Sequence, residues 1–121
     1  MGHHKLERFA ENLTFPNLMQ VSYEHLQEKG FEWRGRWNEY FGNDNPIVLE
    51  LGCGKGDYTV ALAKENPNRN YIGVDIKGAR LWRGAKTAYE EDMKQVAFIR
   101  TRIEMIDQFF SENEVDEIWV T

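Results

Sequence analysis

The stretch VLELGCGKGDY, which occupies Val48–Tyr58, joins a buried-strand pattern to a glycine-rich turn. The run Ile47–Leu51 is almost continuously apolar, as expected for a strand that is covered on both faces. Glycines then follow at every second position, which allows a tight turn whose backbone can approach a ligand closely. The next residues, Asp57–Lys64, have helical spacing, so this stretch predicts a strand, a turn and a helix.

The same alternation of short apolar runs and helical segments continues to the end of the chain. The predicted strands are Ile47–Leu51, Tyr71–Val74, Val96–Ile99 and Val115–Thr121, and the predicted helices between them are Asp57–Lys64, Gly78–Met93 and Ile103–Phe110. This order predicts an α/β fold with a parallel sheet flanked by helices and joined by right-handed crossovers. Ligands of such sheets bind beyond the carboxyl ends of the strands, where the glycine turn lies.

The first 45 residues have weaker periodicity. Short helices are predicted at Lys5–Leu13 and Ser22–Lys29, and Pro16 and Gly30 follow them as breakers. Four aromatic residues then occur at roughly helical spacing, and we expect them to cover the core rather than to stack on nucleic-acid bases. They are Trp33, Trp37, Tyr40 and Phe41.

Composition limits the class of protein. The chain has 121 residues and a net charge of −5, which fits one modest domain or part of a larger one. A single cysteine, Cys53, excludes an internal disulfide framework and fits a reducing compartment. No signal-peptide pattern or membrane-spanning apolar run is present, and the few histidines do not predict a metal site. We therefore expect a cytoplasmic protein without membrane or metal partners.

The spacing of the glycines separates three kinds of ligand. A phosphate-binding P-loop needs two glycines with four residues between them, followed by Lys and Ser or Thr, whereas Gly56 precedes Asp57 and Tyr58. A dinucleotide-binding turn has the pattern GxGxxG, and Asp57 stands where its third glycine belongs. The acids Glu50 and Asp57 also disfavour a pyrophosphate, which binds at the positive end of a helix.

S-adenosylmethionine, which carries an ammonium and a sulfonium group, suits these acids better. Glu50 can receive the ammonium directly or through water, and Asp75, which follows the second strand, can accept both ribose hydroxyl groups. The pattern ExGxGxG with a later acid therefore favours a class I methyltransferase. An acid also occurs at this place in dinucleotide-binding proteins, so a nicotinamide-dependent Rossmann oxidoreductase stays open as an alternative.

Two longer segments resemble the bacterial tRNA (guanine-N(7)-)-methyltransferase family, whose members are class I enzymes with a Rossmann-like fold. One is FGNDNPIVLELGCGKGDYTVALA, which begins at Phe41, and the other is NYIGVDIKGAR, which begins at Asn70. The segments KLERFAENLTFPN and RTRIEMIDQFF are similar to one bacterial branch of the family. The resemblance therefore covers nearly the whole chain.

The resemblance implies methyl transfer from S-adenosylmethionine to N7 of a guanosine in the variable loop of tRNA. The positions that match cofactor-binding residues of the family are Glu50, Gly52, Gly54 and Asp75. Many relatives have an acid near the adenine where this chain has Arg102, so backbone groups of Arg102 and Ile103 are expected to serve there. Because N7 carries a lone pair and no proton, no catalytic residue is expected.

The resemblance also implies a division of the chain. Residues 1–45 are expected to be an N-terminal extension that packs on the core, and residues 46–121 to be the cofactor-binding part of a methyltransferase domain. Relatives continue after the fourth strand with Phe-Pro-Asp-Pro, whereas the sequence stops at Thr121. We therefore expect the N-terminal part of a longer protein, truncated after the fourth strand, inactive and aggregation-prone alone. A non-catalytic fragment is the other alternative.

A tRNA partner requires basic surface. The helix that begins at Gly78 carries Arg80, Arg83 and Lys86 on the side opposite Leu81. This arrangement predicts either a contact surface for tRNA or an ordinary solvated helix face, and the spacing alone does not separate the two.

Overall fold

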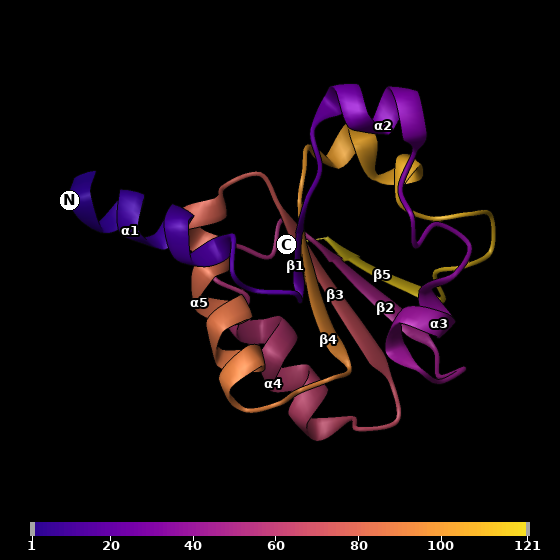
Figure 1. The fold of residues 1–121 in the computed structure, drawn as a ribbon. Coiled ribbons are helices and arrows are strands. Elements are labelled where there is room, and N and C mark those ends of the chain that lie inside the picture. The colour runs from indigo at the N-terminus through magenta and orange to yellow at the C-terminus, as the bar shows by residue number, and fades with distance from the viewer. Residues whose placement is uncertain (1, 121) are drawn as a thin grey trace.

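The computed structural model describes residues 2–120 and shows a five-stranded sheet between two layers of helices (Figure 1). The strand order is β1-β4-β3-β2-β5, and all four pairings are parallel. The strands are β1 (Leu18–Gln20), β2 (Ile47–Leu51), β3 (Asn70–Asp75), β4 (Val96–Arg100) and β5 (Glu117–Val120). The predicted parallel α/β sheet is confirmed.

The helices divide between the two faces of the sheet. They are α1 (Gly2–Asn12), α2 (Tyr23–Lys29), α3 (Trp37–Phe41), α4 (Asp57–Glu65), α5 (Gly78–Glu90) and the 3-10 helix η1 (Ile103–Gln108). Helices α4 and α5 cover one face, α2, α3 and η1 cover the other, and α1 packs along α5 (Figure 1). Strand β3 lies at the centre, and all six of its residues are buried, as its apolar sequence requires.

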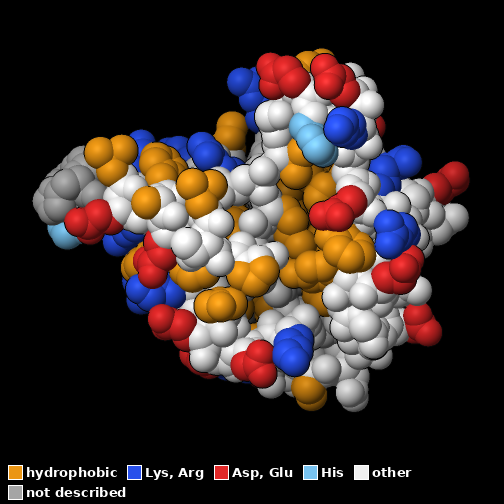
Figure 2. All heavy atoms as spheres, viewed as in Figure 1, with side chains coloured by type: hydrophobic (Ala, Val, Ile, Leu, Met, Phe, Trp, Pro, Cys, Tyr) orange, Lys and Arg blue, Asp and Glu red, His pale blue; other side chains and the backbone are white. Residues whose placement is uncertain are grey.

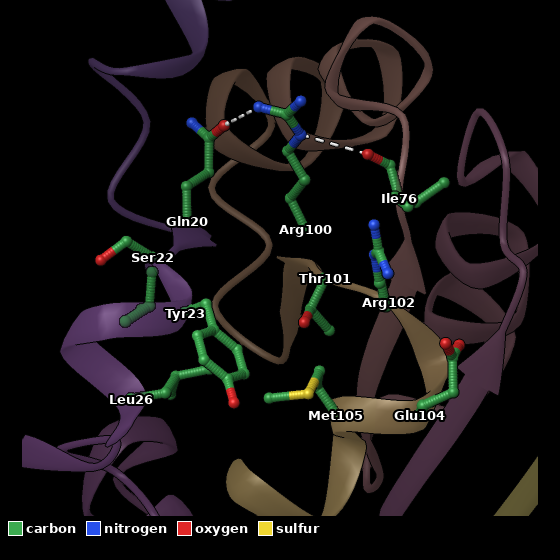
Figure 3. A pocket seen from close by; sticks show the side chains of 11 residues that line it. Gln20, Ser22, Tyr23, Leu26, Ile76, Arg100, Thr101, Arg102, Glu104 and Met105 are labelled. Atoms are coloured by element: carbon green, nitrogen blue, oxygen red, sulfur yellow. Dashed lines mark hydrogen bonds between the residues drawn. The ribbon is translucent and has the colours of Figure 1, made fainter. Parts of the chain in front are cut away.

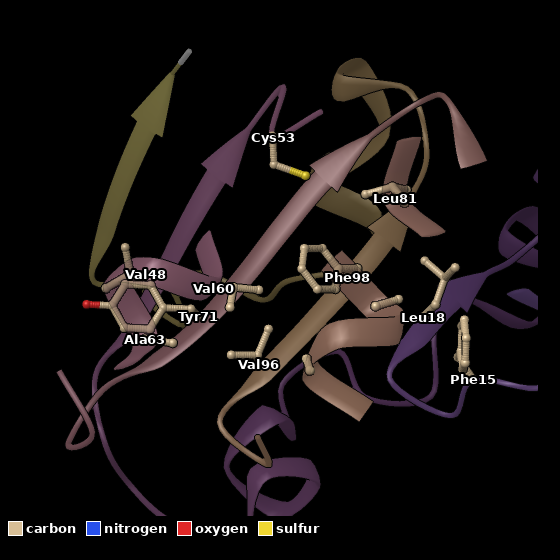
Figure 4. Close-up of a cluster of buried hydrophobic side chains, with 12 residues drawn as sticks. Phe15, Leu18, Val48, Cys53, Val60, Ala63, Tyr71, Leu81, Val96 and Phe98 are labelled. Carbon is tan, nitrogen blue, oxygen red and sulfur yellow. The ribbon is translucent and has the colours of Figure 1, made fainter. Parts of the chain in front are cut away.

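The ring of Phe98, on β4, is fully buried at the centre of the cluster beneath α4 and α5 (Figure 4). Three glycines surround it, because a Cβ atom at Gly56, Gly73 or Gly84 would lie only 2.7–2.8 Å from the ring. At Gly84 an added Cβ would also lie 2.9 Å from the carbonyl oxygen of Lys55. The absence of these side chains lets the glycine turn and α5 close onto the sheet.

The aromatic residues before β2 cover the other face, as predicted. Trp37 is fully buried and Phe41 is nearly so, and the indole Nε1 of Trp37 donates to the carbonyl oxygen of Phe109 at 2.9 Å. Tyr40 and Trp33 are half-buried at the margin of this cluster. These rings are therefore occupied by core packing.

Strand β1 was not predicted from the sequence, because three residues are too few to show a period. It pairs with β4. Two asparagines that precede it in the chain donate hydrogen bonds to backbone carbonyl groups of α5. The amide of Asn12 donates to Gly78 at 2.8 Å, and that of Asn17 donates to Ala85 at 3.1 Å. The beginning of the chain is thus fastened both to the sheet edge and to α5.

Several predicted helices differ in their bounds from the structure. The helix predicted at Lys5–Leu13 is α1, which runs from Gly2 to Asn12. Helix α5 ends at Glu90 rather than Met93, because Asp92 adopts a left-handed backbone with φ of 55°. The predicted buried stripe of α5 is correct for Leu81, Ala85 and Ala88, but Tyr89 is exposed at its margin. The segment predicted as a helix over Ile103–Phe110 is the shorter 3-10 helix η1.

Strand β5 pairs with β2. Its predicted range began at Val115 and included Thr121, which lies outside the described residues; the observed strand is Glu117–Val120. The side chains of Ile118, Trp119 and Val120 are exposed. Exposed apolar edge strands favour association with another chain, so the aggregation expected from the sequence stays a prediction.

The packing around Phe98 yields a stability prediction. Gly84→Ala should lower the free energy of unfolding by about 1–3 kcal/mol, because the new methyl group would overlap Phe98 and the Lys55 carbonyl. The better helix propensity of alanine offsets at most about 1 kcal/mol of this loss. Urea unfolding measures it, with Thr87→Ala in the same helix as the control. A Gly84→Ala protein as stable as that control would contradict the close approach.

Candidate functional site

The glycine turn is held against β3 by its own backbone. The amides of Gly52 and Cys53 both donate to the carbonyl oxygen of Val74, at 2.8 and 3.0 Å. Gly52, Gly54 and Gly56 have φ values of 77°, 59° and 76°, a left-handed conformation that side chains disfavour. The alternating glycines of the sequence are therefore required by the backbone path, and a Cβ at Gly54 would meet only open space.

Asp75 connects β3 to the turn. Its carboxylate accepts the amide of Gly54 at 2.8 Å through Oδ2 and the amide of Lys77 at 3.0 Å through Oδ1. The two oxygens of a carboxylate can accept about four hydrogen bonds together, so these contacts leave acceptor positions available. Asp75 therefore fixes the turn and can still receive hydroxyl groups from a ligand.

Glu50 lies beneath the turn. Its side chain is buried, and the hydroxyl of Thr59, in the first turn of α4, donates to its carboxylate. Sequence reasoning missed Thr59, although a hydroxyl residue two positions after the start of the helix was a signal for it. The hydrogen bond from Thr59 therefore fixes the orientation of the Glu50 carboxylate.

A cavity of about 410 Å³ lies at the carboxyl ends of β2, β3 and β4. Four of the six predicted site residues line it, namely Gly52, Asp75, Arg102 and Ile103. Of the other two, Gly54 is hydrogen-bonded to Asp75 and Glu50 is buried below. The cavity wall also includes Ile76, Thr101 and Glu104, which the sequence analysis did not single out.

Ile76 is the most informative of these missed residues. It follows Asp75 directly, its side chain is 51% exposed, and it lines the cavity. A large apolar residue just outside a buried strand, next to a functional acid, was the signal available. Together, Ile76 and Ile103 give the cavity apolar surface beside the Asp75 carboxylate.

Comparison with known proteins places this arrangement in a family. Residues 44–121 match the family described as "Putative methyltransferase". The chain belongs to this methyltransferase family. The tRNA (guanine-N(7)-)-methyltransferase of Christiangramia forsetii is 62% identical over 118 residues, which cover 97% of this chain and 53% of that protein. The resemblance seen in the sequence is confirmed, and the chain spans about half the length of the curated relatives it matches.

Solved methyltransferase structures share the fold. An antibiotic-related methyltransferase superposes with a TM-score of 0.62 at 23% identity, covering 71% of this chain and 45% of the other. Phosphoethanolamine N-methyltransferase 2 of Haemonchus contortus, in complex with S-adenosyl-L-methionine, superposes with a TM-score of 0.53 at 21% identity. The match covers 81% of this chain and 24% of the other. The predicted Rossmann-like class I methyltransferase fold is confirmed.

Two of the three residues of the predicted basic helix face lie beside acids, and Arg80 is the third. Arg83 lies 3.6 Å from a carboxylate oxygen of Asp57, and Lys86 lies 3.3 Å from one of Glu11. Figure 2 shows basic and acidic side chains interspersed over the visible face. Within this part of α5, the solvated-face interpretation therefore fits better than a continuous basic surface.

Neither a cluster of metal-binding side chains nor a membrane-spanning helix is found among residues 2–120. No group of three or more potential metal-binding side chains gathers in this part of the chain. Over the same residues, no helix combines the length and the apolar character needed to cross a membrane.

The thiol of Cys53 gives a prediction about pH. Burial raises its pKa well above the ordinary range, and the charges of Glu50 and Asp75 raise it further. The unfolded thiol ionises near pH 8.5 while the folded one stays neutral, so stability is full below that pH and falls above it. When the pH rises from 7.5 to 9.5, this thiol should lower the free energy of unfolding by roughly 1 kcal/mol.

The measurement is urea unfolding at both pH values for the wild type and for Cys53→Ala. The difference between the two proteins isolates the contribution of the thiol from those of other titrating groups. Iodoacetamide should also label Cys53 slowly until urea unfolds the protein. Rapid labelling of the native protein, or equal pH dependence in both proteins, would show that the thiol ionises freely.

Proposed function

We propose that this chain forms the cofactor-binding part of an S-adenosylmethionine-dependent tRNA (guanine-N(7)-)-methyltransferase. The observation that carries the proposal is the Asp75 carboxylate, which ties down the glycine turn while it faces the cavity with acceptor positions to spare. The name of the 62% identical relative supports the choice of tRNA as substrate. The nicotinamide-dependent alternative finds no support in the family match.

The residues of the cavity fit S-adenosylmethionine. The Asp75 carboxylate suits the two ribose hydroxyl groups, and the open space above Gly54 leaves room for a ligand against the backbone. Ile76 and Ile103 offer apolar surface to a purine, and the backbone of Arg102 and Ile103 lies at the same wall. We assign Glu50, fixed by Thr59, to the ammonium end through water or directly.

When bound, S-adenosylmethionine supplies a methyl group on a positively charged sulfur. Nitrogen 7 of guanine attacks with its own lone pair and has no proton to lose, so the residues of this chain need to orient the cofactor rather than to act as a base. Glu50 and Asp75 are buried, so in this proposal their carboxylates interact with the positively charged ligand in a partly desolvated site. No catalytic residue is assigned within this chain.

The test of the reaction uses the complete gene product and tRNA transcripts with radiolabelled S-adenosylmethionine. Label should enter the transcript that contains guanosine in its variable loop. It should not enter a matched transcript in which 7-deazaguanosine replaces that residue, because this base lacks nitrogen 7. Equal labelling of both transcripts would exclude N7 of this guanosine as the acceptor, and the absence of labelling in both would exclude tRNA of this kind as the substrate.

The test of the cofactor site is the substitution Asp75→Ala. Loss of charged hydrogen bonds to the ribose should weaken S-adenosylhomocysteine binding by roughly 1.5–3 kcal/mol, or about 10- to 150-fold. Calorimetry measures the dissociation constant, with NADH as the comparison ligand. Asp116→Ala, which removes a carboxylate that accepts an amide at the opposite end of β2, is a control. Unchanged affinity in Asp75→Ala, or tighter binding of NADH, would contradict the assignment.

A further inference from the structure

A second cavity, of about 640 Å³, adjoins the proposed cofactor site (Figure 3). The two cavities share Ile76, Thr101, Arg102 and Glu104 as lining residues. The rest of the wall comes from Arg100 at the end of β4, from Met105 in η1 and from the segment Gln20–Leu26, which runs from the end of β1 into α2. The beginning of the chain therefore forms one side of a space that continues the cofactor cavity.

Tyr23 stands in this wall, in the first turn of α2. The helix is fixed at its start by Ser22, whose hydroxyl oxygen accepts the amide of His25 at 3.1 Å. It is fixed along its length by Leu26, which is buried in the core. Positions three apart share a helix face, so the anchoring of Leu26 keeps Tyr23 on the cavity side. The Tyr23 side chain is nevertheless 61% exposed, so it has a large surface available for contact.

The opposite wall is positioned by Arg100. Its guanidinium donates to the carbonyl oxygen of Ile76 at 3.1 Å and to the side-chain oxygen of Gln20 at 3.3 Å (Figure 3). These bonds connect the loop after β3 to β1 across the top of the cavity. In Figure 3 the side chains of Tyr23 and Met105 lie beside one another at the lower end. The space is thus bounded by aromatic and apolar surface on elements that are tied together.

The charges of this space are of both signs and do not select an anion. The Arg100 guanidinium is already engaged by two oxygen acceptors, and the guanidinium of Arg102 and the carboxylate of Glu104 both lie in the wall. A flat, uncharged ring suits it better, because tyrosine, leucine, isoleucine and methionine all line it and aromatic faces stack well on bases. Side-chain groups of Thr101 and Gln20 are available to the polar edge of such a ring.

We propose that the adenine ring of the cofactor extends into this joined space and that Tyr23 forms its outer wall. The inference rests on the proposed function, because Asp75 then holds the ribose at the boundary and the base continues away from Gly54 toward Ile76 and Thr101. The N-terminal segment, which lies outside the glycine turn and its strands, thereby becomes part of the cofactor site. Tyr23 acts as a specificity residue for the nucleoside end of the ligand.

The experiment compares two ligands that differ only in the base. S-adenosylhomocysteine carries adenine, and S-ribosylhomocysteine is the same molecule without it. Tyr23→Ala should raise the dissociation constant of S-adenosylhomocysteine about tenfold, which corresponds to about 1.4 kcal/mol. It should leave that of S-ribosylhomocysteine unchanged, because no ring remains to contact Tyr23. Calorimetry or displacement of labelled ligand from the complete gene product gives both constants.

Two further variants distinguish loss of the contact between the Tyr23 ring and adenine from a general loss of structure. Tyr23→Phe keeps the ring and should bind S-adenosylhomocysteine within about twofold of the wild type. Tyr89→Ala removes a tyrosine of α5 that is 53% exposed and lines a different cavity, and it should have no effect on either ligand. A general loss of structure in Tyr23→Ala would weaken both ligands alike, and this result would overturn the assignment of Tyr23 to the base.

The outcomes distinguish this inference from the proposed function. If the wild type binds no S-adenosylhomocysteine, the cofactor assignment fails and this inference fails with it. If the wild type binds it and Tyr23→Ala binds it equally well, only the role of Tyr23 is overturned. A loss confined to the ligand that carries adenine supports both.

Discussion

The ring of Phe98 occupies a space that three neighbouring segments leave free by having no side chain at the point of contact. Gly56 belongs to the glycine turn, Gly73 to β3 and Gly84 to α5. An added Cβ atom at any of them would overlap sterically with the ring of Phe98. Close-packed interiors do not absorb such overlaps without shifts of backbone or side chains. The seating of α4 and α5 on the sheet, and with it the position of the turn at the sheet edge, therefore depends on this one buried ring.

A second connection carries that position into the chemistry of the site. The Asp75 carboxylate binds the amides of Gly54 and Lys77, so the turn has its shape before any ligand arrives. Preorganised sites lose less conformational freedom on binding than flexible ones. The hydroxyl of Thr59 likewise orients the Glu50 carboxylate before a ligand binds. The two acids are thus held by the protein itself, and a ligand meets oriented acceptors.

Much of this could be predicted from the sequence because its causes are local. The left-handed backbone of Gly52 and Gly54 follows from their spacing, and Asp75 is adjacent to its strand. Strand β1, Thr59 and Tyr23 could not be predicted in the same way. A three-residue strand shows no period, and a tyrosine at the start of an amphipathic helix shows nothing of the cavity it faces. Their roles depend on contacts with β4, Glu50 and η1, which only the folded chain brings near.

The pairing of β1 with β4 joins parts of the chain that are made at different times. Gln20 and Arg100, which share a hydrogen bond across this edge, are 80 positions apart. At usual rates of about 5–20 residues per second, the ribosome takes several seconds to produce the partner after it has produced β1. The opening segment must wait unpaired during that interval, while β2, β3 and α4 can already form nearer contacts. Assembly of this edge of the sheet can therefore only follow synthesis of β2, β3 and α4, and the wall that contains Tyr23 is completed with it.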